Sequence, residues 1–188
     1  MTARLAGLPP IVDARARVLI LGSFPSEASL AAQQYYAHRQ NQFWKILGAV
    51  IGQPLFDMDY AAKQAAVQAA GVAIWDVYAS CERAGSLDAA IRNGVPNDFA
   101  RLQKCHPAGV QPISLRKSGL PADAGVLSAL ALRRVCFNGQ TAGRFAPQLT
   151  ALGYETRVLP STSPANASWS FERKLAAWRE GIAGSLPG

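Results

Sequence analysis

Apolar residues in this chain are grouped into short runs and into longer segments in which they recur at helical spacing. Short runs in which nearly every residue is apolar are typical of strands that are covered on both faces of a sheet. Longer amphipathic or alanine-rich segments predict helices. The pattern therefore predicts strands at residues 18–21, 71–77, 133–138 and 156–160, and helices at residues 43–51, 60–70, 141–152 and 171–182.

The alternation of predicted strands and helices favours an α/β fold with a mostly parallel sheet and helices on both of its faces. We find no internal repeat and no sign of a second domain, and 188 residues suit a single domain spanning residues 1–188. Residues 104–125 are rich in Pro and Gly and carry Arg116 and Lys117, so we expect a long surface loop there. Ser168 or Ser170 is placed to cap the last helix.

Polar stretches follow each of the four predicted strands. Because ligands of parallel α/β sheets gather beyond the carboxyl ends of the strands, we expect the segments after Leu21, Trp75, Phe137 and Leu159 to surround one cleft. These segments hold GSFPS and QQYYAHRQNQFWK after the first strand, Asp76 after the second, Asn-Gly after the third and LPSTSPANAS at the fourth. Each stretch alone is also typical of an ordinary turn, but their shared position favours a site.

The composition narrows the class of partner. A surplus of 19 Lys and Arg over 12 Asp and Glu gives a net charge of +7, which is compatible with a nucleic acid, although many basic enzymes never bind one. Cys81, Cys105 and Cys136 lack Cys-x-x-Cys spacing, which fits reduced thiols and argues against a disulfide framework or an iron–sulfur cluster. We find no signal-peptide pattern and no apolar run near the ~20 residues that span a bilayer, so we expect a cytoplasmic protein without a membrane partner.

Four of these stretches, taken in order, carry a family resemblance. GSFPS, QQYYAHRQNQFWK, FNG and LPSTSPANAS resemble the motifs of the uracil-DNA glycosylase superfamily, and most of all those of its hypoxanthine-DNA (deoxyinosine) glycosylase group. The resemblance implies a three-layer α/β/α sandwich with a central four-stranded, mainly parallel sheet. It also implies a DNA repair enzyme that flips a deaminated base out of the duplex, hydrolyses its N-glycosidic bond and leaves an abasic site.

The resemblance assigns catalysis to a neutral amide. Asn41 matches the catalytic asparagine of the hypoxanthine group, and its carbonyl oxygen would orient the attacking water. Its place just before Phe43 and Trp44 also suits a simple helix cap. Mismatch-specific uracil/thymine relatives carry a catalytic asparagine at position 24, where this chain has Phe24. That departure favours hypoxanthine as the first substrate, with uracil as a second substrate to be tested.

Other residues are implied to bind the extruded base. Tyr36 matches the aromatic residue that stacks on the base, and its alternative is core packing beside Tyr35. Asn138 matches the asparagine that reads the N–H and C=O edge shared by hypoxanthine and uracil, although Asn138 and Gly139 also form a typical strand-end turn. The implied base-binding residues are Gly22, Ser23, Phe24, Tyr36 and Asn138.

Contacts with the DNA backbone are expected from two loops. The loop after the last strand supplies hydroxyl groups for phosphates, and its Pro-Ala-Asn segment, with Ala165 in the middle, lies where relatives insert a wedge, although no large side chain is present there. His38 either contacts the substrate or braces its loop, and Arg39 either approaches DNA or is solvated. The expected DNA-binding residues are Ser26, His38, Ser161, Thr162, Ser163, Pro164 and Asn166.

Other chemistries fit the sequence less well. Two histidines, of which His106 is expected at the surface, and the lack of a nucleophile elbow argue against a Ser-His-Asp hydrolase. Apart from Lys45, which lies inside the helix predicted at residues 43–51, the motifs contain no lysine that could form a Schiff base. We therefore expect a monofunctional glycosylase that needs no metal and no cofactor. Asp76 would suit either a base or water contact or a strand-end cap, and the sequence assigns it no catalytic role.

We therefore expect a monomeric enzyme whose partner is DNA containing deaminated bases. Two alternatives stay open at this point. One is a uracil-preferring or mismatch-specific glycosylase, and the other is a catalytically silent module that binds damaged DNA without releasing a base. Retention of both Asn41 and Asn138 argues against the silent module.

Overall fold

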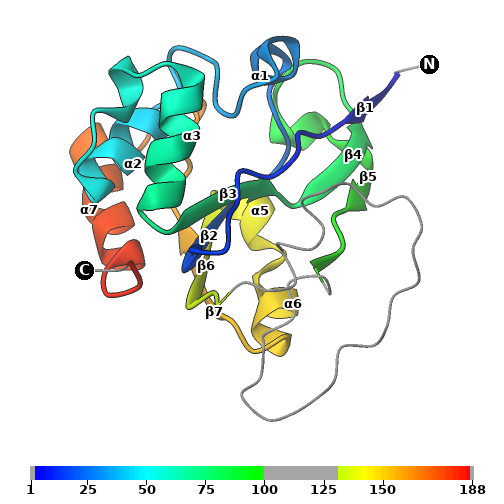
Figure 1. Cartoon of the computed structure of the whole chain (residues 1–188). Helices are drawn as coiled ribbons and strands as arrows, with labels where there is room; N and C mark the ends of the chain where they lie inside the picture. Colours follow the sequence, from blue (N-terminus) through cyan, green and yellow to red (C-terminus); the bar gives the residue numbers. More distant parts are fainter. Residues whose placement is uncertain (1–2, 100–130, 187–188) are drawn as a thin grey trace.

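A four-stranded parallel sheet forms the centre of the molecule. The computed structural model describes residues 3–99 and 131–186, and Figure 1 shows how the sheet lies between groups of helices. The strands are β2 (Val18–Gly22), β3 (Val72–Asp76), β6 (Arg134–Asn138) and β7 (Glu155–Leu159), in the order β3-β2-β6-β7. All neighbouring pairs are parallel. The four predicted strands and the predicted α/β class are therefore confirmed.

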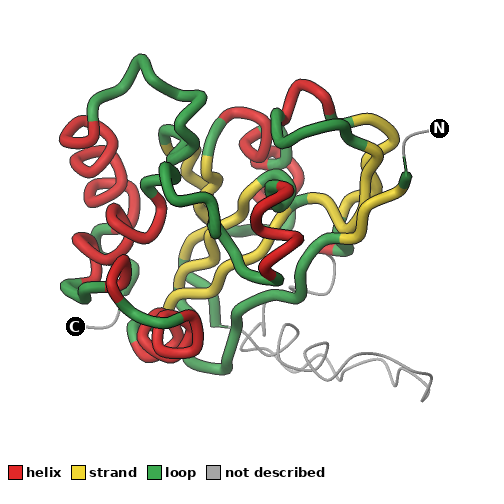
Figure 2. Tube along the Cα trace, turned by 90° about the horizontal axis from the view of Figure 1, so that it is seen from above, coloured by secondary structure: helices red, strands yellow, loops and turns green. Residues whose placement is uncertain are grey.

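Helices cover both faces of this sheet, as Figure 2 shows from above. One face is covered by α2 (Phe43–Ile51), α3 (Tyr60–Ala69) and α7 (Phe171–Ile182), and the other by α5 (Gln140–Gly143) and α6 (Ala146–Ala151). The single helix predicted at residues 141–152 was wrong, because the chain forms α5 and α6 instead. Pro147 has no backbone N–H and its ring collides with the carbonyl four residues earlier, so a continuous helix cannot pass Gly143.

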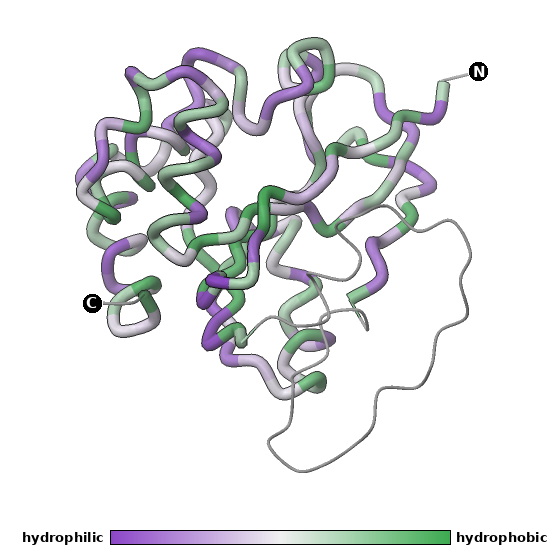
Figure 3. The backbone as a smooth tube through the Cα atoms, in the orientation of Figure 1, coloured by the Kyte–Doolittle hydropathy of each residue, from purple (hydrophilic) through white to green (hydrophobic). Residues whose placement is uncertain are grey.

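The central strands are buried because each of their faces packs into a separate apolar core. Val18 and Ile20 of β2 point into the core that includes α2, α3 and α7, whereas Leu19 and Leu21 point into the core beneath α5 and α6. All four of these side chains are fully buried. Figure 3 shows the resulting concentration of hydrophobic residues along the middle of the fold, which explains why these strands lack polar alternation.

A second, smaller sheet was not predicted. It is antiparallel, with the order β1-β4-β5, and consists of β1 (Arg4–Ala6), β4 (Tyr78–Glu82) and β5 (Arg92–Pro96). Most residues of β1 and β5 are exposed, so these strands carry no apolar run that the hydrophobic pattern could reveal. Three short helices complete the described chain: α1 (Glu27–Ala32), η1 (Leu55–Asp57) and η2 (Asp88–Ala90).

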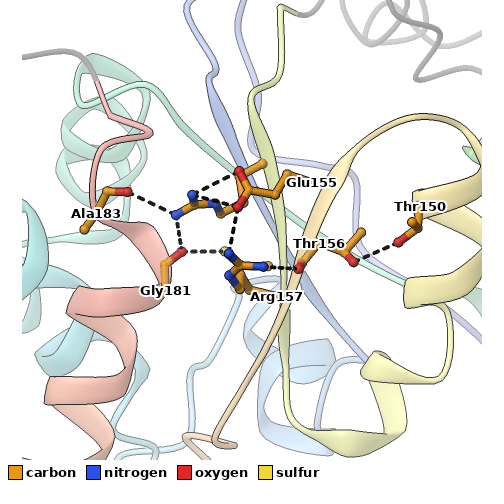
Figure 4. Close-up of polar contacts among 8 residues, drawn as sticks. Thr150, Glu155, Thr156, Arg157, Gly181 and Ala183 are labelled. Atoms are coloured by element: carbon orange, nitrogen blue, oxygen red, sulfur yellow. Dashed lines mark hydrogen bonds and ion pairs between the residues drawn. The ribbon is translucent and has the colours of Figure 1, made fainter.

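An ion-pair cluster fixes α7 to the amino-terminal edge of the sheet (Figure 4). Arg134 of β6 donates to both carboxylate oxygens of Glu155 on β7, each at 3.0 Å. Its other terminal nitrogen donates to the carbonyl oxygens of Gly181 and Ala183, at 2.7 and 3.1 Å, at the end of α7. A cation is favourable there because the carbonyls of the last helical turn lack partners within the helix. With this end fixed, α7 begins at the opposite edge of the sheet, next to the loop that follows β7.

One prediction cannot be compared with the structure. The long surface loop at residues 104–125, with Cys105, His106, Arg116 and Lys117, lies outside the described residues. Within the described ranges, no helix combines the length and apolar character needed to cross a membrane.

Candidate active site

A cavity of about 530 Å³ opens at the carboxyl edge of the central sheet. Its volume falls within the roughly 300–1,000 Å³ that is usual for ligand pockets. Segments that follow all four central strands contribute to its wall, as the sequence pattern predicted. The cavity brings together most of the predicted site residues: Gly22, Ser23, Phe24, Ser26, Tyr36, Asn41, Asn138, Ser161, Thr162, Ser163 and Asn166.

The floor of the cavity is a single row across three strands. Gly22 is the register partner of Asp76 on β3. On the other side the register of β2 with β6 runs to Leu21 opposite Phe137, so Asn138 is the next residue of β6. Residues in one row of a parallel sheet point to the same face, so Asp76 and Asn138 flank the space above Gly22. The Tyr36 hydroxyl fills that space, because a Cβ at position 22 would lie 2.8 Å from its oxygen and would collide with Asp76 Oδ1. Glycine is therefore required at position 22 by close approach.

Tyr36 is held rigidly above this floor. Its ring stacks on Phe43 of α2 with a centroid separation of 3.7 Å and an interplanar angle of 14°. Its backbone adopts a left-handed conformation with φ of 53°, which is uncommon for an aromatic residue. Burial, and secondarily the charge of Asp76, raises the pKa of the Tyr36 hydroxyl, so this group stays protonated. Tyr36 thus lines the cavity and packs against the core at the same time.

Asn138 connects the floor to the loop after β7. Its Nδ2 donates to Tyr36 Oη at 3.1 Å and to Thr162 Oγ1 at 2.9 Å, and its Oδ1 accepts from Thr162 N at 2.9 Å. Both N–H groups of the amide are therefore already used within the protein. One lone pair of Oδ1 is left for a ligand. The predicted base-reading role of Asn138 stays a prediction, and it requires either that lone pair or the exchange of an internal hydrogen bond.

Asn41 lies on the cavity wall at the start of α2. Its Oδ1 accepts from Phe43 N at 2.9 Å. The N-cap residue of α2 is Gln42, whose side chain makes no capping bond, so Asn41 supports the helix start from one residue before the cap. A carbonyl oxygen has a second lone pair, which can accept from a water molecule in the cavity. The next residue fixes the segment, because Gln42 N donates to Thr162 O at 3.0 Å and Gln42 Oε1 accepts from Lys174 Nζ of α7 at 3.0 Å.

The GSFPS turn is held in place by contacts with η2, with α1 and with the residue that follows β4. Ser23 Oγ donates to Asp88 Oδ1 at 2.6 Å, and Ser26 Oγ accepts from Ser29 N as the cap of α1. Arg83, which follows β4 and is only 4% exposed, donates to the Pro25 carbonyl and lies 5.2 Å from the centroid of the Phe24 ring. Phe24 therefore belongs to the structural frame of the turn as well as to the cavity wall.

A protein-family model decides the relationship that this geometry suggests. The model for the uracil DNA glycosylase superfamily matches residues 9–182. The chain belongs to the uracil DNA glycosylase superfamily. A curated relative named hypoxanthine DNA glycosylase from Methanosarcina acetivorans is 37% identical over 168 residues, which is 89% of this chain and 92% of that protein. Another of the same name from Methanosarcina barkeri is 33% identical over 174 residues, 93% of this chain and 95% of that protein.

A solved structure supports the fold of this superfamily member. The solution structure of a candidate uracil DNA glycosylase from Methanosarcina acetivorans has a TM-score of 0.74 and 35% sequence identity. The likeness covers 95% of this chain and 98% of that one. The described helices and the four-stranded parallel sheet therefore form the sandwich that the sequence motifs of this superfamily implied.

The phosphate-binding loop predicted for this superfamily member is ordered by its own hydrogen bonds. Ser161 Oγ accepts from Ser163 N, and Ser163 O accepts from Asn166 N. Thr162 is fully buried and its hydroxyl accepts from Asn138. A direct phosphate contact by Thr162 therefore stays a prediction that requires the loop to open. Pro164 is exposed and is not part of the cavity wall.

His38 and Arg39 lie outside the main cavity. Both are exposed and line a separate hollow of about 280 Å³. His38 O accepts from Asn41 N at 2.8 Å, and His38 Nδ1 accepts from Gln40 N at 3.3 Å. These bonds close the turn before Asn41, so they favour the bracing role for His38 in this superfamily member. Substrate contacts by His38 and Arg39 stay untested.

Sequence reasoning missed three contributors to the site. Asp88 comes from η2, and Trp169 comes from the segment before α7. In the sequence, the only signal for Trp169 is its position directly after the LPSTSPANAS stretch.

Asp76 was noted in the sequence but was given no catalytic role. It is 4% exposed and its Oδ2 has no hydrogen-bond partner among the described residues. Burial, aided by the charge of Asp88 and opposed by Arg83, raises the pKa of Asp76 to about 8.

Proposed function

We propose that this protein is a monofunctional DNA glycosylase that releases hypoxanthine from deoxyinosine in DNA, takes uracil as a second substrate and leaves an abasic site. Two relatives at 37% and 33% identity bear the name hypoxanthine DNA glycosylase. The observation that carries the proposal is the Asn41 amide, which lies on the wall of a cavity that Tyr36 and Asn138 also line.

The geometry supports a reaction in which the protein positions groups and transfers few protons. An extruded base would lie in the cavity against the Tyr36 ring, and base–aromatic stacking contributes about 1–3 kcal/mol. The free lone pair of Asn41 Oδ1 would orient water toward C1′ while the bond to the base breaks. Fixed hydrogen-bond donors stabilise the negative charge that develops on the departing base. No lysine is found among the described residues that line the cavity, which supports hydrolysis without a Schiff base.

A base-release assay tests the proposed reaction. Duplexes with one deoxyinosine, one deoxyuridine or only normal bases would be incubated with excess protein and then treated with alkali, which cleaves at abasic sites. We expect cleavage of the deoxyinosine duplex first and of the deoxyuridine duplex more slowly. Chromatography would identify the released base. Protein that binds these duplexes but releases nothing would leave the catalytically silent binding module as the function.

A faster release of uracil would identify the second candidate, a uracil-preferring glycosylase. The candidate uracil DNA glycosylase among the similar structures, at 35% identity, is the observation that favours it. The same two duplexes separate the candidates. A hypoxanthine glycosylase would release hypoxanthine faster than uracil, and a uracil-preferring glycosylase would release uracil faster than hypoxanthine.

Asn41 is tested by separating catalysis from helix capping. Asn41→Ala removes both the water contact and the bond to Phe43 N, whereas Asn41→Ser keeps a capping oxygen but is too short to place the water. We expect both variants to lose roughly 10²–10³-fold in single-turnover rate, as is typical when one such positioning group is removed. Only Asn41→Ala should lower the stability, by about 1 kcal/mol.

Gln40→Ala is the matched control, because Gln40 is exposed and lies outside the cavity wall. It should keep the wild-type rate. An Asn41→Ser variant with the wild-type rate would remove Asn41 from catalysis and leave it as a structural cap.

Three further features belong to the proposal. We infer a single domain, a monomer and a location in the cytoplasm. The two described cysteines, Cys81 and Cys136, are both buried free thiols, which supports a reducing compartment. Among the described residues, His, Cys, Asp and Glu form no group of three that could hold a metal ion. The duplex DNA that carries the deaminated base is the proposed partner.

A further inference from the structure

Asp76 is a buried carboxyl group on the floor of the cavity for which the proposed mechanism has no use. It lines the cavity, is 4% exposed, and its Oδ2 has no hydrogen-bond partner among the described residues. A buried polar atom without a partner is costly unless a ligand supplies one. The neighbouring Asn138 has both N–H groups engaged by Tyr36 and Thr162. The carboxyl group is thus freer than the asparagine to contact a base.

Burial first, and then the surrounding charges, set the protonation state of Asp76. Asp88 of η2 repels a negative charge on Asp76, and Arg83 opposes that effect from the end of β4. Tyr36 and Tyr35 also face this region, and both hydroxyls have raised pKa values, so neither carries a charge. Burial is the largest effect and brings the pKa of Asp76 to about 8. At neutral pH the carboxyl group is therefore mainly protonated and can donate a hydrogen bond.

The chemistry of base release requires this neutral state. Deamination replaces an exocyclic amino group, which donates hydrogen bonds, with an oxygen that accepts them. During release the base takes the electrons of the glycosidic bond and becomes negatively charged. An ionised carboxylate on the floor would repel both the exocyclic oxygen and the developing anion, whereas a carboxylic acid stabilises both.

We propose that Asp76, held as a neutral carboxylic acid, is a further base-contacting residue whose O–H donates a hydrogen bond to the exocyclic oxygen of the extruded base. The inference rests on the proposed glycosylase function and extends it to the residue that distinguishes an oxo group from an amino group. Asp76 stays protonated throughout, so the base leaves with no proton transfer from this residue.

Two substitutions of Asp76 test the contact. Asp76→Asn keeps the shape and offers an N–H donor that does not titrate, whereas Asp76→Leu keeps a similar volume and offers no donor. Single-turnover release of hypoxanthine would be measured with excess protein between pH 6 and pH 9. At pH 7 we expect Asp76→Asn to stay within about fivefold of wild type, and Asp76→Leu to lose roughly ten- to a hundredfold.

The pH profile separates hydrogen bonding from a structural role. The wild-type rate should fall relative to that of Asp76→Asn as the pH passes about 8, and this ratio cancels any titration of the substrate. Asp57→Asn, at an exposed position outside the cavity, is the control and should follow wild type.

The possible failures are distinguishable. Wild-type protein that releases no base overturns the proposed function, and the inference with it. Active wild-type protein with an equally active Asp76→Leu variant overturns the inference alone. The same conclusion follows if Asp76→Asn is as slow as Asp76→Leu, or if the ratio of wild type to Asp76→Asn is constant across the pH range.

Discussion

Asp76 shows how a single residue joins stability to the chemistry of the site. It is the last residue of β3 and lies beside Gly22, whose missing side chain makes room for the Tyr36 hydroxyl. The fold buries the carboxyl group without giving Oδ2 a partner in the described chain. Folding therefore favours the protonated form, and deprotonation acts against the folded state. The same property that suits Asp76 to contact an oxo group should make the free protein less stable as the pH rises from about 4 to about 8.

The pH dependence of the free energy of unfolding measures how much the buried Asp76 carboxyl group destabilises the folded protein. In the unfolded chain the carboxyl group has an ordinary pKa of 3.8, whereas in the folded chain it is raised to about 8. Between these values the folded state holds a proton that the unfolded state releases, so the free energy of unfolding falls as the pH rises. Relative to Asp76→Asn, wild type should lose on the order of several kcal/mol between pH 4 and pH 8, with little further change above that.

Urea unfolding of both proteins at several pH values would measure this difference. Asp57→Asn, a substitution of an exposed carboxyl group, provides the comparison for general charge effects. A constant difference between wild type and Asp76→Asn at all pH values would show that the folded state does not hold the proton on Asp76.

Among the elements, the loop after β7 has the most connections to the site. Thr162 is its centre, because it bonds to Asn138 at the end of β6 through both its backbone N–H and its hydroxyl. Its carbonyl accepts from Gln42 N at the start of α2. Three elements that are distant in the sequence therefore meet at one buried residue, and the position of Asn41 depends on it.

Thr162→Val tests this connection with almost no change in shape. The substitution removes the acceptor of one Asn138 N–H and leaves that buried donor unpaired, which costs about 1–3 kcal/mol. We expect the free energy of unfolding in urea to fall by that amount, and base release to slow because the loop and Asn138 lose their fixed positions.

Thr150→Val is a matched control, since Thr150 bonds to Thr156 at an exposed position (Figure 4) and does not line the cavity. It should change stability by less than about 0.5 kcal/mol. Equal losses of stability from the two substitutions would mean that the hydrogen bond between Thr162 and Asn138 contributes no more than the exposed bond between Thr150 and Thr156.

The elements also show what the sequence alone could predict. Strands β2, β3 and β6 were predictable because burial on both faces leaves a continuous apolar run. The edge strand β7 is mostly exposed, and its only apolar signal is the Val158–Leu159 pair at its end. Strands β1 and β5 were not, since exposed edge strands carry no such run. The motifs identified the cavity wall, as for Tyr36 and Asn41. The contacts of Arg83 with the GSFPS turn depend on the second sheet, and no local pattern in the sequence records them.

For the molecule as a whole, the main question is how it holds a bent or opened duplex against the cavity. The net charge of +7 supplies attraction that does not depend on base sequence. The segment where relatives place a wedge, Pro164 to Asn166, has no large side chain. Trp169 is the large aromatic residue closest to it in the chain. It lines the cavity, is half-buried, and has the Arg173 guanidinium 4.5 Å from its ring centroid.

We therefore predict that Trp169 contacts bases at the mouth of the cavity when the damaged nucleotide is extruded. Trp169→Ala should weaken binding to a deoxyinosine duplex by about 1–3 kcal/mol, the usual contribution of one stacked base. The salt dependence of binding should not change, because no charge is removed. Trp169→Phe should restore most of the affinity. Arg173→Gln is the complementary variant, and it should reduce the salt dependence by about one phosphate contact.

Fluorescence of 2-aminopurine placed next to the deoxyinosine distinguishes a role of Trp169 in base extrusion from a contact with the DNA surface alone. This probe brightens when its neighbour leaves the stack, so wild-type protein should raise the signal and Trp169→Ala should raise it less at saturating concentration. Saturation matters because it removes the difference in affinity and leaves only the fraction of extruded base. An unchanged signal together with weaker binding would place Trp169 on the DNA surface without a role in extrusion. Unchanged affinity and unchanged signal would exclude Trp169 from the interface. Another part of the chain would then have to fill the gap that the extruded base leaves in the duplex.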